Sequence, residues 1–257
     1  MALKIHSRRG CASKIIPFLR ACSRRRFLAM TLACSAAPAR PATSAWNGKN
    51  GETATMPGAE TTSLNAHRRA IYENELDDPE YSFADDRSGG IEIHAFGRDF
   101  APVGTDEGYV LLTNGMSDRR MTLPTSHREK GEKQRAELMW YVREPTPEII
   151  VNLRWLAELP FMDATWFGFG HRVPMPTPPV EGCDFRTFLF LTPIIETDQR
   201  IAEALMVEND PVEILTVNLI SDAEYRFIKE KGLDPFLDML DEEDYPPIFD
   251  AKRKSYL

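Results

Sequence analysis

The stretch YVLLTNG, from Tyr109 to Gly115, combines a strand with the reversal that has to follow it. Tyr109 to Thr113 is a continuous apolar run, which suits a strand buried inside a sheet. Asn114 and Gly115 come directly after it, and both residues tolerate the positive φ angles that a tight reversal needs. The sequence therefore predicts a strand that turns sharply, with another strand following over Arg119–Leu123.

Four further segments have strand patterns on either side of this reversal. In the first of them, Ile91, Ile93 and Ala95 alternate with Glu92 and His94, as expected for a half-buried strand over Ile91–Phe96. The other three are rich in apolar and β-branched residues. They cover Ala136–Val142, Phe185–Thr192 and Val212–Leu219.

Helices are predicted between these strands. Leu64–Leu76 is followed by an Asp-Asp-Pro turn, and Thr146-Pro147-Glu148 has the cap, proline and acidic residue that open a helix. Ser221 and Glu224 have capping-box spacing, and Gly232 can end the helix that they begin. A short helix over Pro235–Leu240 comes next. The order favours an α/β fold of the α+β type, in which one domain packs a mixed sheet against helices.

The charge of the chain is distributed very unevenly. The net charge of the 257 residues is -8, but residues 1–45 hold nine Lys and Arg and no acidic residue. The remainder has 22 basic and 39 acidic residues, which gives -17. Such a domain repels phosphate backbones, so no nucleic-acid partner is expected, whereas a basic protein would be attracted.

The basic N-terminal segment resembles a twin-arginine export signal, carried by Ser23, Arg24, Arg25, Phe27 and Leu28. The apolar run that follows is too short to span a bilayer, and small residues at Ala39 and Ala45 suit cleavage. We therefore expect a leader over 1–45, a flexible linker over 46–62 and the domain over 63–257. Export implies the periplasm or cell surface. Two alternatives remain, an uncleaved anchor and a true start at Met56, which would leave the protein in the cytoplasm.

Cysteine usage points to a domain held together by its core. Cys11, Cys22 and Cys34 fall within the expected leader, which leaves Cys183 alone in the domain. One thiol cannot form an internal disulfide, and the spacing of Cys and His residues indicates no zinc site. We expect neither a metal nor a cofactor.

Asp118, Glu137 and His171 are the residues on which an enzyme hypothesis would rest, with Asp163 as a further carboxylate. In that alternative the chain is a small hydrolase or a ligand-binding protein. The opposing interpretation is structural. Asp118 then stabilises the turn after Asn114, Glu137 pairs with Arg135 or Arg119, and His171 is a hydrogen-bonded structural residue. Ser117 lacks the GxSxG pattern of a nucleophile elbow.

The segment ATWFGFGHRVP, Ala164–Pro174, places Trp166, Phe167, Phe169 and His171 among glycines and close to prolines. Such composition indicates a loop, and loops with exposed aromatic side chains commonly bind proteins. These four residues are our candidates for partner binding. It is equally consistent with the sequence that at least two of the three aromatic side chains cover the core. The basic triplet Lys252-Arg253-Lys254 is expected to be a solvated chain end.

Several separated blocks resemble the suppressor-of-fused-like domain of bacterial proteins. They are TNGMSDRRM (113–121), RAELM (135–139), ATWFGFGHRVP (164–174), FRTFLFLTP (185–193) and ILTVNLISDAEYRFIKEKGLDPFLDML (214–240). The resemblance implies a mixed α/β domain that binds proteins without catalysis. Animal members restrain transcription factors and carry a second, C-terminal domain, for which this chain is too short. Bacterial relatives include immunity proteins, which implies a toxin, here a basic one, as the partner.

Overall fold

A computed structural model describes residues 58–84, 90–100, 107–242 and 247–257. The residues expected to form the export signal, from Ser23 to Leu28, lie outside the described residues, as does most of the expected linker. Helix α2 begins at Gly58, five residues before the expected domain boundary, so the end of the segment assigned to the linker is helical.

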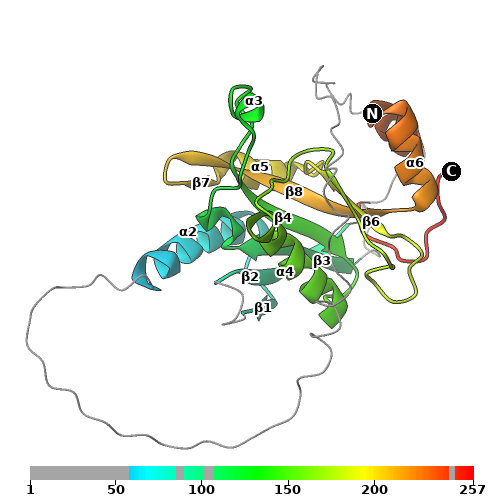
Figure 1. Ribbon diagram of the computed structural model, residues 1–257. Coiled ribbons are helices and arrows are strands. Elements are labelled where there is room, and N and C mark those ends of the chain that lie inside the picture. Colours follow the sequence, from blue (N-terminus) through cyan, green and yellow to red (C-terminus); the bar gives the residue numbers. More distant parts are fainter. Residues whose placement is uncertain (1–57, 85–89, 101–106, 243–246) are drawn as a thin grey trace, which may run out of the picture. The chain divides into compact units, whose positions relative to one another are not determined.

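A mixed eight-stranded sheet forms the centre of the described domain (Figure 1). Its order is β1-β2-β3-β4-β8-β6-β5, with β7 paired to β8 beside this path. All its pairs are antiparallel except β4 with β8, which confirms the predicted mixed sheet. The strands are β1 (Tyr81–Phe83), β2 (Glu92–Asp99), β3 (Glu107–Asn114), β4 (Arg135–Val142), β5 (Arg172–Pro174), β6 (Thr187–Leu191), β7 (Met206–Val207) and β8 (Asp210–Ile220).

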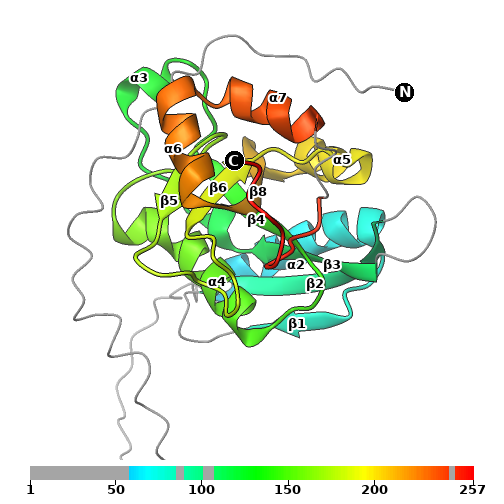
Figure 2. The same cartoon turned by 90° about the vertical axis from the view of Figure 1, so that its right-hand side faces the viewer.

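Helices cover both faces of this sheet (Figure 2). On one side lie α5, α6 and α7, and α4 lies on the other. Helix α2 shares an apolar cluster with α5, so the two cover the same face. The helices are α2 (Gly58–Leu76), α3 (Thr125–Arg128), α4 (Pro147–Met162), α5 (Glu196–Ala204), α6 (Asp222–Lys231) and α7 (Asp234–Glu242), with a 3-10 turn η2 at Met116–Asp118.

Strand β4 shows what this covering does, because all eight of its residues are buried. Alternate side chains of a strand point to opposite faces, so a strand with helices on both sides has no face toward solvent. Met139 and Tyr141 belong to the cluster under α2 and α5. Trp140, next to them in sequence, faces the other way and meets the ring of Phe188 edge-on at 5.9 Å.

The helix starts follow the capping residues in the sequence. Thr146 caps α4, with its hydroxyl accepting a hydrogen bond from the Ile149 amide, and Ser221 forms the predicted capping box with Glu224. Gly232 ends α6 with a φ of 98°. Helix α5 and the short strands β1, β5 and β7 have no counterpart in the sequence prediction.

The strand predicted over Arg119–Leu123 is wrong. The chain does reverse after β3, and Gly115 has a φ of 128°, but β3 pairs with β4 instead. The Met121 amide donates to Gln134 and the Thr122 amide to Thr165, so this segment has no regular ladder. Met121 and Leu123 are nevertheless both buried, which explains the strand-like pattern.

Candidate functional site

The segment Ala164–His171, which we call the aromatic loop, connects the end of α4 to the edge strand β5. Ala164 leaves the helix with a φ of 48°. Gly170 has a φ of 79°, and its amide donates to the Phe190 carbonyl at 2.7 Å. The His171 amide closes the turn by donating to the Gly168 carbonyl at 3.1 Å. The loop is therefore fixed to β6 at its C-terminal end.

The three aromatic side chains of this loop point to different surroundings. Phe167 is 1% exposed and stacks on Phe190, with the ring centroids 4.4 Å apart. Phe169 is 38% exposed. Trp166 lies between them in exposure. Phe167 therefore belongs to the core, and only Trp166 and Phe169 of the three are placed where a partner could reach them.

Two histidines enclose the Trp166 side chain. Its ring lies 4.8 Å from the His127 ring and 5.0 Å from the His171 ring, measured between centroids. His127 comes from α3, so this contact joins the aromatic loop to the segment between β3 and β4. His127 Nδ1 lies 2.7 Å from a Glu132 carboxylate oxygen, which orients the His127 ring. No pattern in the sequence indicated that His127 and Glu132 are neighbours of this loop.

His171 is a structural member of this arrangement. Its Nδ1 lies 3.2 Å from the Trp166 carbonyl oxygen, so that nitrogen carries the proton. Burial lowers the pKa of His171, although the Trp166 carbonyl and Glu132 act in the opposite direction. A neutral imidazole against a tryptophan ring is well suited to packing.

Glu137 is held in a closed network of donors. Its carboxylate accepts hydrogen bonds from the Thr113 and Ser117 hydroxyls, both at 2.6 Å, and from the Ser117 and Gly115 amides at 2.9 and 3.1 Å. Its side chain has no exposed surface. The predicted pairing with Arg135 or Arg119 is wrong, because the nearest cation is Arg68 at 3.6 Å. These bonds fix the turn after β3.

Asp118 binds the same arginine, with 2.5 Å between its carboxylate and Arg68 Nη1. Asp118 and Glu137 therefore share a buried cation beneath α2. Within the described residues His171 forms no hydrogen bond to either carboxylate, and the charged groups that shift the pKa of His171 are Glu132, His127 and Arg172. The arrangement required by the hydrolase alternative is not formed.

Arg68 is the central residue that the sequence interpretation missed. It lies on α2 with no exposed side-chain surface, between the apolar Leu64 and Tyr72 one turn away on either side. A signal was present, because Arg68 occupies an i, i+4 position on the apolar face of a predicted helix. A charge at such a position indicates a buried partner.

Clusters of metal ligands and membrane-spanning helices are both absent from the described part of the chain. There, no group of three or more His, Cys, Asp or Glu side chains is arranged to hold a metal ion. Within the same residues no helix combines the length and apolar character needed to cross a bilayer.

The described domain is thus a mixed α/β domain with a buried polar cluster and an aromatic loop at its surface. The family model of the suppressor of fused protein (SUFU) matches residues 89–254, which is well over half of the chain. The chain belongs to the suppressor of fused family. No curated protein sequence matches it.

Solved structures show the same fold at low sequence identity. A structure described as that of a SUFU homologue from Neisseria gonorrhoeae is 18% identical with a TM-score of 0.59, over 76% of this chain and 98% of the other. A Sufu–Fu complex gives 13% identity and a TM-score of 0.54, over 76% and 91%. Drosophila Suppressor of Fused gives 13% and 0.51, over 75% of this chain and only 50% of the fly protein.

Proposed function

We propose that this chain acts without catalysis by binding another protein in fixed stoichiometry, with the aromatic loop as part of the binding surface. We further propose that it is an immunity-type protein whose partner is a toxin with a basic surface. The observation that carries the proposal is Phe169, an exposed aromatic side chain on a loop whose backbone is fixed.

The physical support comes from how the aromatic loop is built. Phe167 packs into the core beneath it, and the Gly170 amide binds β6, so Phe169 is presented by a prearranged backbone. Binding then requires little ordering of the loop, which reduces the entropic cost of association. Aromatic side chains are enriched at the centres of protein interfaces. Trp166, held between His127 and His171, would enlarge the same surface.

The identity of the partner is supported by charge and by relatives. Residues 46–257 carry -17, and electrostatic complementarity accelerates association with a positively charged protein. One relative of the same fold has been solved as a complex of Sufu with Fu. Both points favour a protein partner for this chain.

The experiment is affinity capture with the domain as bait, using proteins from bacteria that make the chain, followed by titration of the purified partner. We expect a 1:1 complex that Phe169→Lys weakens by roughly 10-fold or more, as for an interface anchor. Val151→Lys is the control, because Val151 is also an exposed apolar side chain and lies on α4, outside the aromatic loop. Equal effects of the two substitutions would contradict the proposed surface.

The toxin assignment has its own test. Co-expression of the captured partner with this chain should restore growth that the partner alone suppresses, and Phe169→Lys should reduce the rescue. If the partner alone does not suppress growth, the proposed immunity role is wrong, whereas the proposed binding role still stands.

We propose in addition that residues 1–45 direct export. Mass spectrometry of the mature protein should find a new N-terminus after Ala39 or Ala45. Replacing both Arg24 and Arg25 by Lys should leave the protein in the cytoplasm with the leader attached. An N-terminus at Met56 would contradict export.

A further inference from the structure

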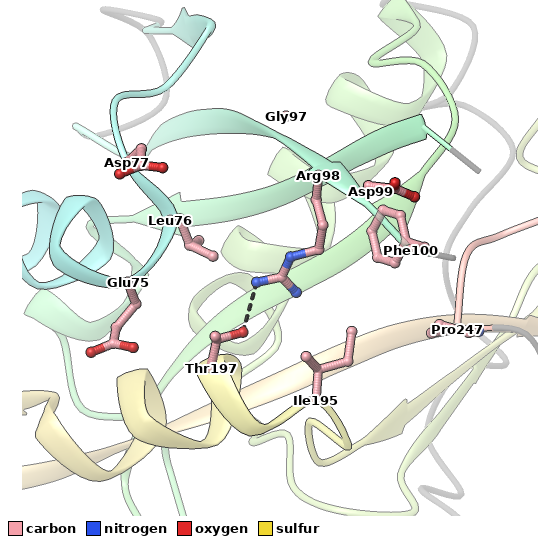
Figure 3. Close-up of a pocket in the computed structure, with 10 residues that line it drawn as sticks. All are labelled: Glu75, Leu76, Asp77, Gly97, Arg98, Asp99, Phe100, Ile195, Thr197 and Pro247. Carbon is pink, nitrogen blue, oxygen red and sulfur yellow. Dashed lines mark hydrogen bonds between the residues drawn. The ribbon is translucent and has the colours of Figure 1, made fainter. Parts of the chain in front are cut away.

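Polar side chains near the surface of the domain differ in how completely the fold pairs them. In the groove between the C-terminal end of α2, the end of β2 and the beginning of α5, Arg98 donates to the Thr197 hydroxyl at 2.9 Å (Figure 3). Arg98 also donates to Asp198, at 2.7 and 2.8 Å, and the Asp198 side chain has no exposed surface. The charge of Arg98 is therefore matched within the fold.

The surroundings of Trp166 in the aromatic loop are paired less completely. The indole Nε1 of Trp166 is buried, and it has no hydrogen-bond acceptor in the part of the chain that the structure describes. A buried donor without an acceptor destabilises the arrangement that contains it, because the same group would be hydrogen-bonded in water. The position of the Trp166 ring therefore has a cost that is relieved when the ring turns toward solvent.

Two histidine rings hold the Trp166 side chain in this position. The His127 ring lies 4.8 Å and the His171 ring 5.0 Å from the Trp166 ring, measured between centroids. His171 also holds the backbone of the loop, because its Nδ1 lies 3.2 Å from the Trp166 carbonyl oxygen and its amide donates to Gly168. The closed form of the aromatic loop thus depends on the His171 ring staying in place.

The surroundings of His171 oppose a charge on its ring. Burial lowers the pKa of His171, and His127 from α3 and Arg172 from β5 act in the same direction. The Trp166 carbonyl and the carboxylate of Glu132 act the other way, but the pKa is lowered overall. A protonated His171 is therefore more stable where its ring reaches water than where it packs on Trp166.

The other elements around the loop contribute mainly uncharged groups to it. These are the Pro160 carbonyl of α4, the Phe190 ring of β6 and the Leu233 side chain between α6 and α7. Strand β8 brings Glu213, whose pKa is raised by burial and further by Glu132, while Lys133 opposes the shift. The carboxylate of Glu132 thus connects Glu213 to the two histidines.

The direction of the pKa shift gives the pH range in which the loop is held. An open loop leaves His171 with an ordinary pKa of about 6.5, whereas the closed loop lowers the pKa of His171 below that value. The closed form is therefore fully favoured above about pH 6.5 and loses stability relative to the open form as the pH falls below it.

We propose that His127, Trp166 and His171 form an acid-sensitive latch, which keeps the aromatic loop closed at neutral pH and releases Trp166 in acid. Release loosens the backbone that presents Phe169, so the bound protein has to order the loop and binds more weakly. The inference deepens the proposed function, and its consequence for binding rests on that function, since it states when the binding surface is ordered.

Fluorine NMR of the full chain labelled with fluorotryptophan tests the latch without a partner. The Trp166 signal is assigned with Trp166→Phe, and its exposure is measured as line broadening by the soluble radical TEMPOL. Between pH 6.5 and pH 5 the ratio of open to closed loop rises at most about tenfold for each pH unit. We expect the broadening of Trp166 to increase several-fold, while Trp140, which has no exposed surface, stays protected.

His171→Asn isolates the group responsible. Asparagine can donate to the Trp166 carbonyl as Nδ1 of histidine does, but it does not titrate. The broadening of Trp166 in this variant should be the same at neutral and acidic pH. His94→Gln is the control, because His94 is a buried histidine outside the loop, and its variant should keep the full pH response. A response that persists in His171→Asn would overturn the inference.

A measurement on the unaltered chain covers the case in which His171→Asn fails to fold. NMR titration of the His171 ring protons should give a pKa below about 6.5. A pKa at or above that value would overturn the inference. The inference would also be wrong if Trp166 stayed protected from TEMPOL while His171 took up its proton.

The captured partner separates the latch from the proposed function. Its affinity for the unaltered chain should fall between neutral pH and about pH 5, and the fall should be smaller for His171→Asn. Equal falls would show that other titrating groups control binding, which contradicts the latch as a regulator and leaves the proposed function standing. Release of Trp166 in acid by a chain that captures no protein would support the latch and contradict the proposed function.

Discussion

Arg68 Nε donates a hydrogen bond to Asn114 Oδ1 at 2.7 Å, and this bond determines the orientation of the Asn114 amide. Because the oxygen faces Arg68, the amide nitrogen faces His94 and lies 3.1 Å from its Nε2. That ring nitrogen must therefore accept, and the proton sits on Nδ1, which lies 2.8 Å from the Ser82 hydroxyl. The buried Arg68 thus determines the donor and acceptor roles in a series of hydrogen bonds that runs from α2 through β3 and β2 to β1.

Replacing Arg68 by Met should strongly destabilise the domain. The substitution leaves Glu137 without its nearest cation and Asn114 without the donor that orients it, and breaking a buried ionic network costs roughly 3–5 kcal/mol. Urea unfolding measures the loss. Arg69→Met is the control one position along, because Arg69 is exposed and its i, i+4 pair with Glu73 contributes about 0.5 kcal/mol or less. Similar losses in both variants would contradict a structural role for the buried network.

His94 should stay neutral far into the acidic range. Burial lowers the pKa of His94 to about 4, with a smaller contribution from Arg69, whereas Glu73 acts the other way. Glu92 lies 3.3 Å from Nε2 and would favour the charged form, but its side chain is 37% exposed and therefore screened, so burial prevails. NMR titration of the His94 ring protons measures this directly.

The same pKa shift makes folding stability depend on pH. In the unfolded chain His94 takes up a proton near pH 6.5, whereas in the folded state it is protonated only when the pH falls to about 4. Stability is therefore complete above pH 6.5 and falls by roughly 3 kcal/mol as the pH drops from 6.5 to 4. His94→Gln should flatten this part of the profile, and His67→Gln at an exposed position of α2 should not. An unchanged slope in His94→Gln would show that other groups cause it.

Local sequence patterns correctly predicted those helices and strands that are determined by residues within the element itself. The cap at Thr146, the capping box at Ser221 and the apolar strands β3, β4, β6 and β8 were all readable, since each depends on residues a few positions apart. Helix α5 was missed because its sequence is mostly polar, with Ile201 as its fully buried apolar contact.

Contacts between segments that are distant in the sequence could not be predicted from it. Phe167 and Phe169 are chemically alike and two positions apart, yet one is stacked on Phe190 and the other is exposed. Arg253, expected in a solvated chain end, instead binds the buried carboxylate of Glu224, 29 positions away. Such outcomes depend on which segments the fold brings together.

The two glycines of the aromatic loop should differ sharply in their tolerance of alanine. Gly170 has a φ of 79°, and a Cβ there would come within 2.7 Å of the Leu233 side chain, so Gly170→Ala should cost about 1–2 kcal/mol. A Cβ at Gly168 would meet nothing within 4 Å, and Gly168→Ala should change stability by less than about 0.5 kcal/mol. Thermal unfolding of the two variants tests the contrast, which would fail if Gly168→Ala were equally costly.

The C-terminal segment should be held by the pair of Glu224 in α6 and Arg253. The Glu224 carboxylate receives hydrogen bonds from both terminal nitrogens of Arg253, at 2.7 and 2.8 Å, and from the amides of Ser221 and Tyr256. Burial acts to raise the pKa of Glu224, but Arg253 and these amides outweigh it, so the pKa is lowered overall. Glu224→Gln should cost roughly 3 kcal/mol at pH 7 and expose residues 250–257 to carboxypeptidase.

The acid behaviour of this variant follows from the direction of the pKa shift. Because the folded-state pKa is lowered, the stabilisation is present above the unfolded pKa of about 4.3 and is lost as the pH falls through the folded value. The stability difference between wild type and Glu224→Gln should therefore shrink as the pH drops below about 4. Glu230→Gln, at an exposed position of the same helix, should match wild type at pH 7. A difference between wild type and Glu224→Gln that stays constant down to pH 2 would show that packing, and not the charge on Glu224, holds the C-terminal segment in place.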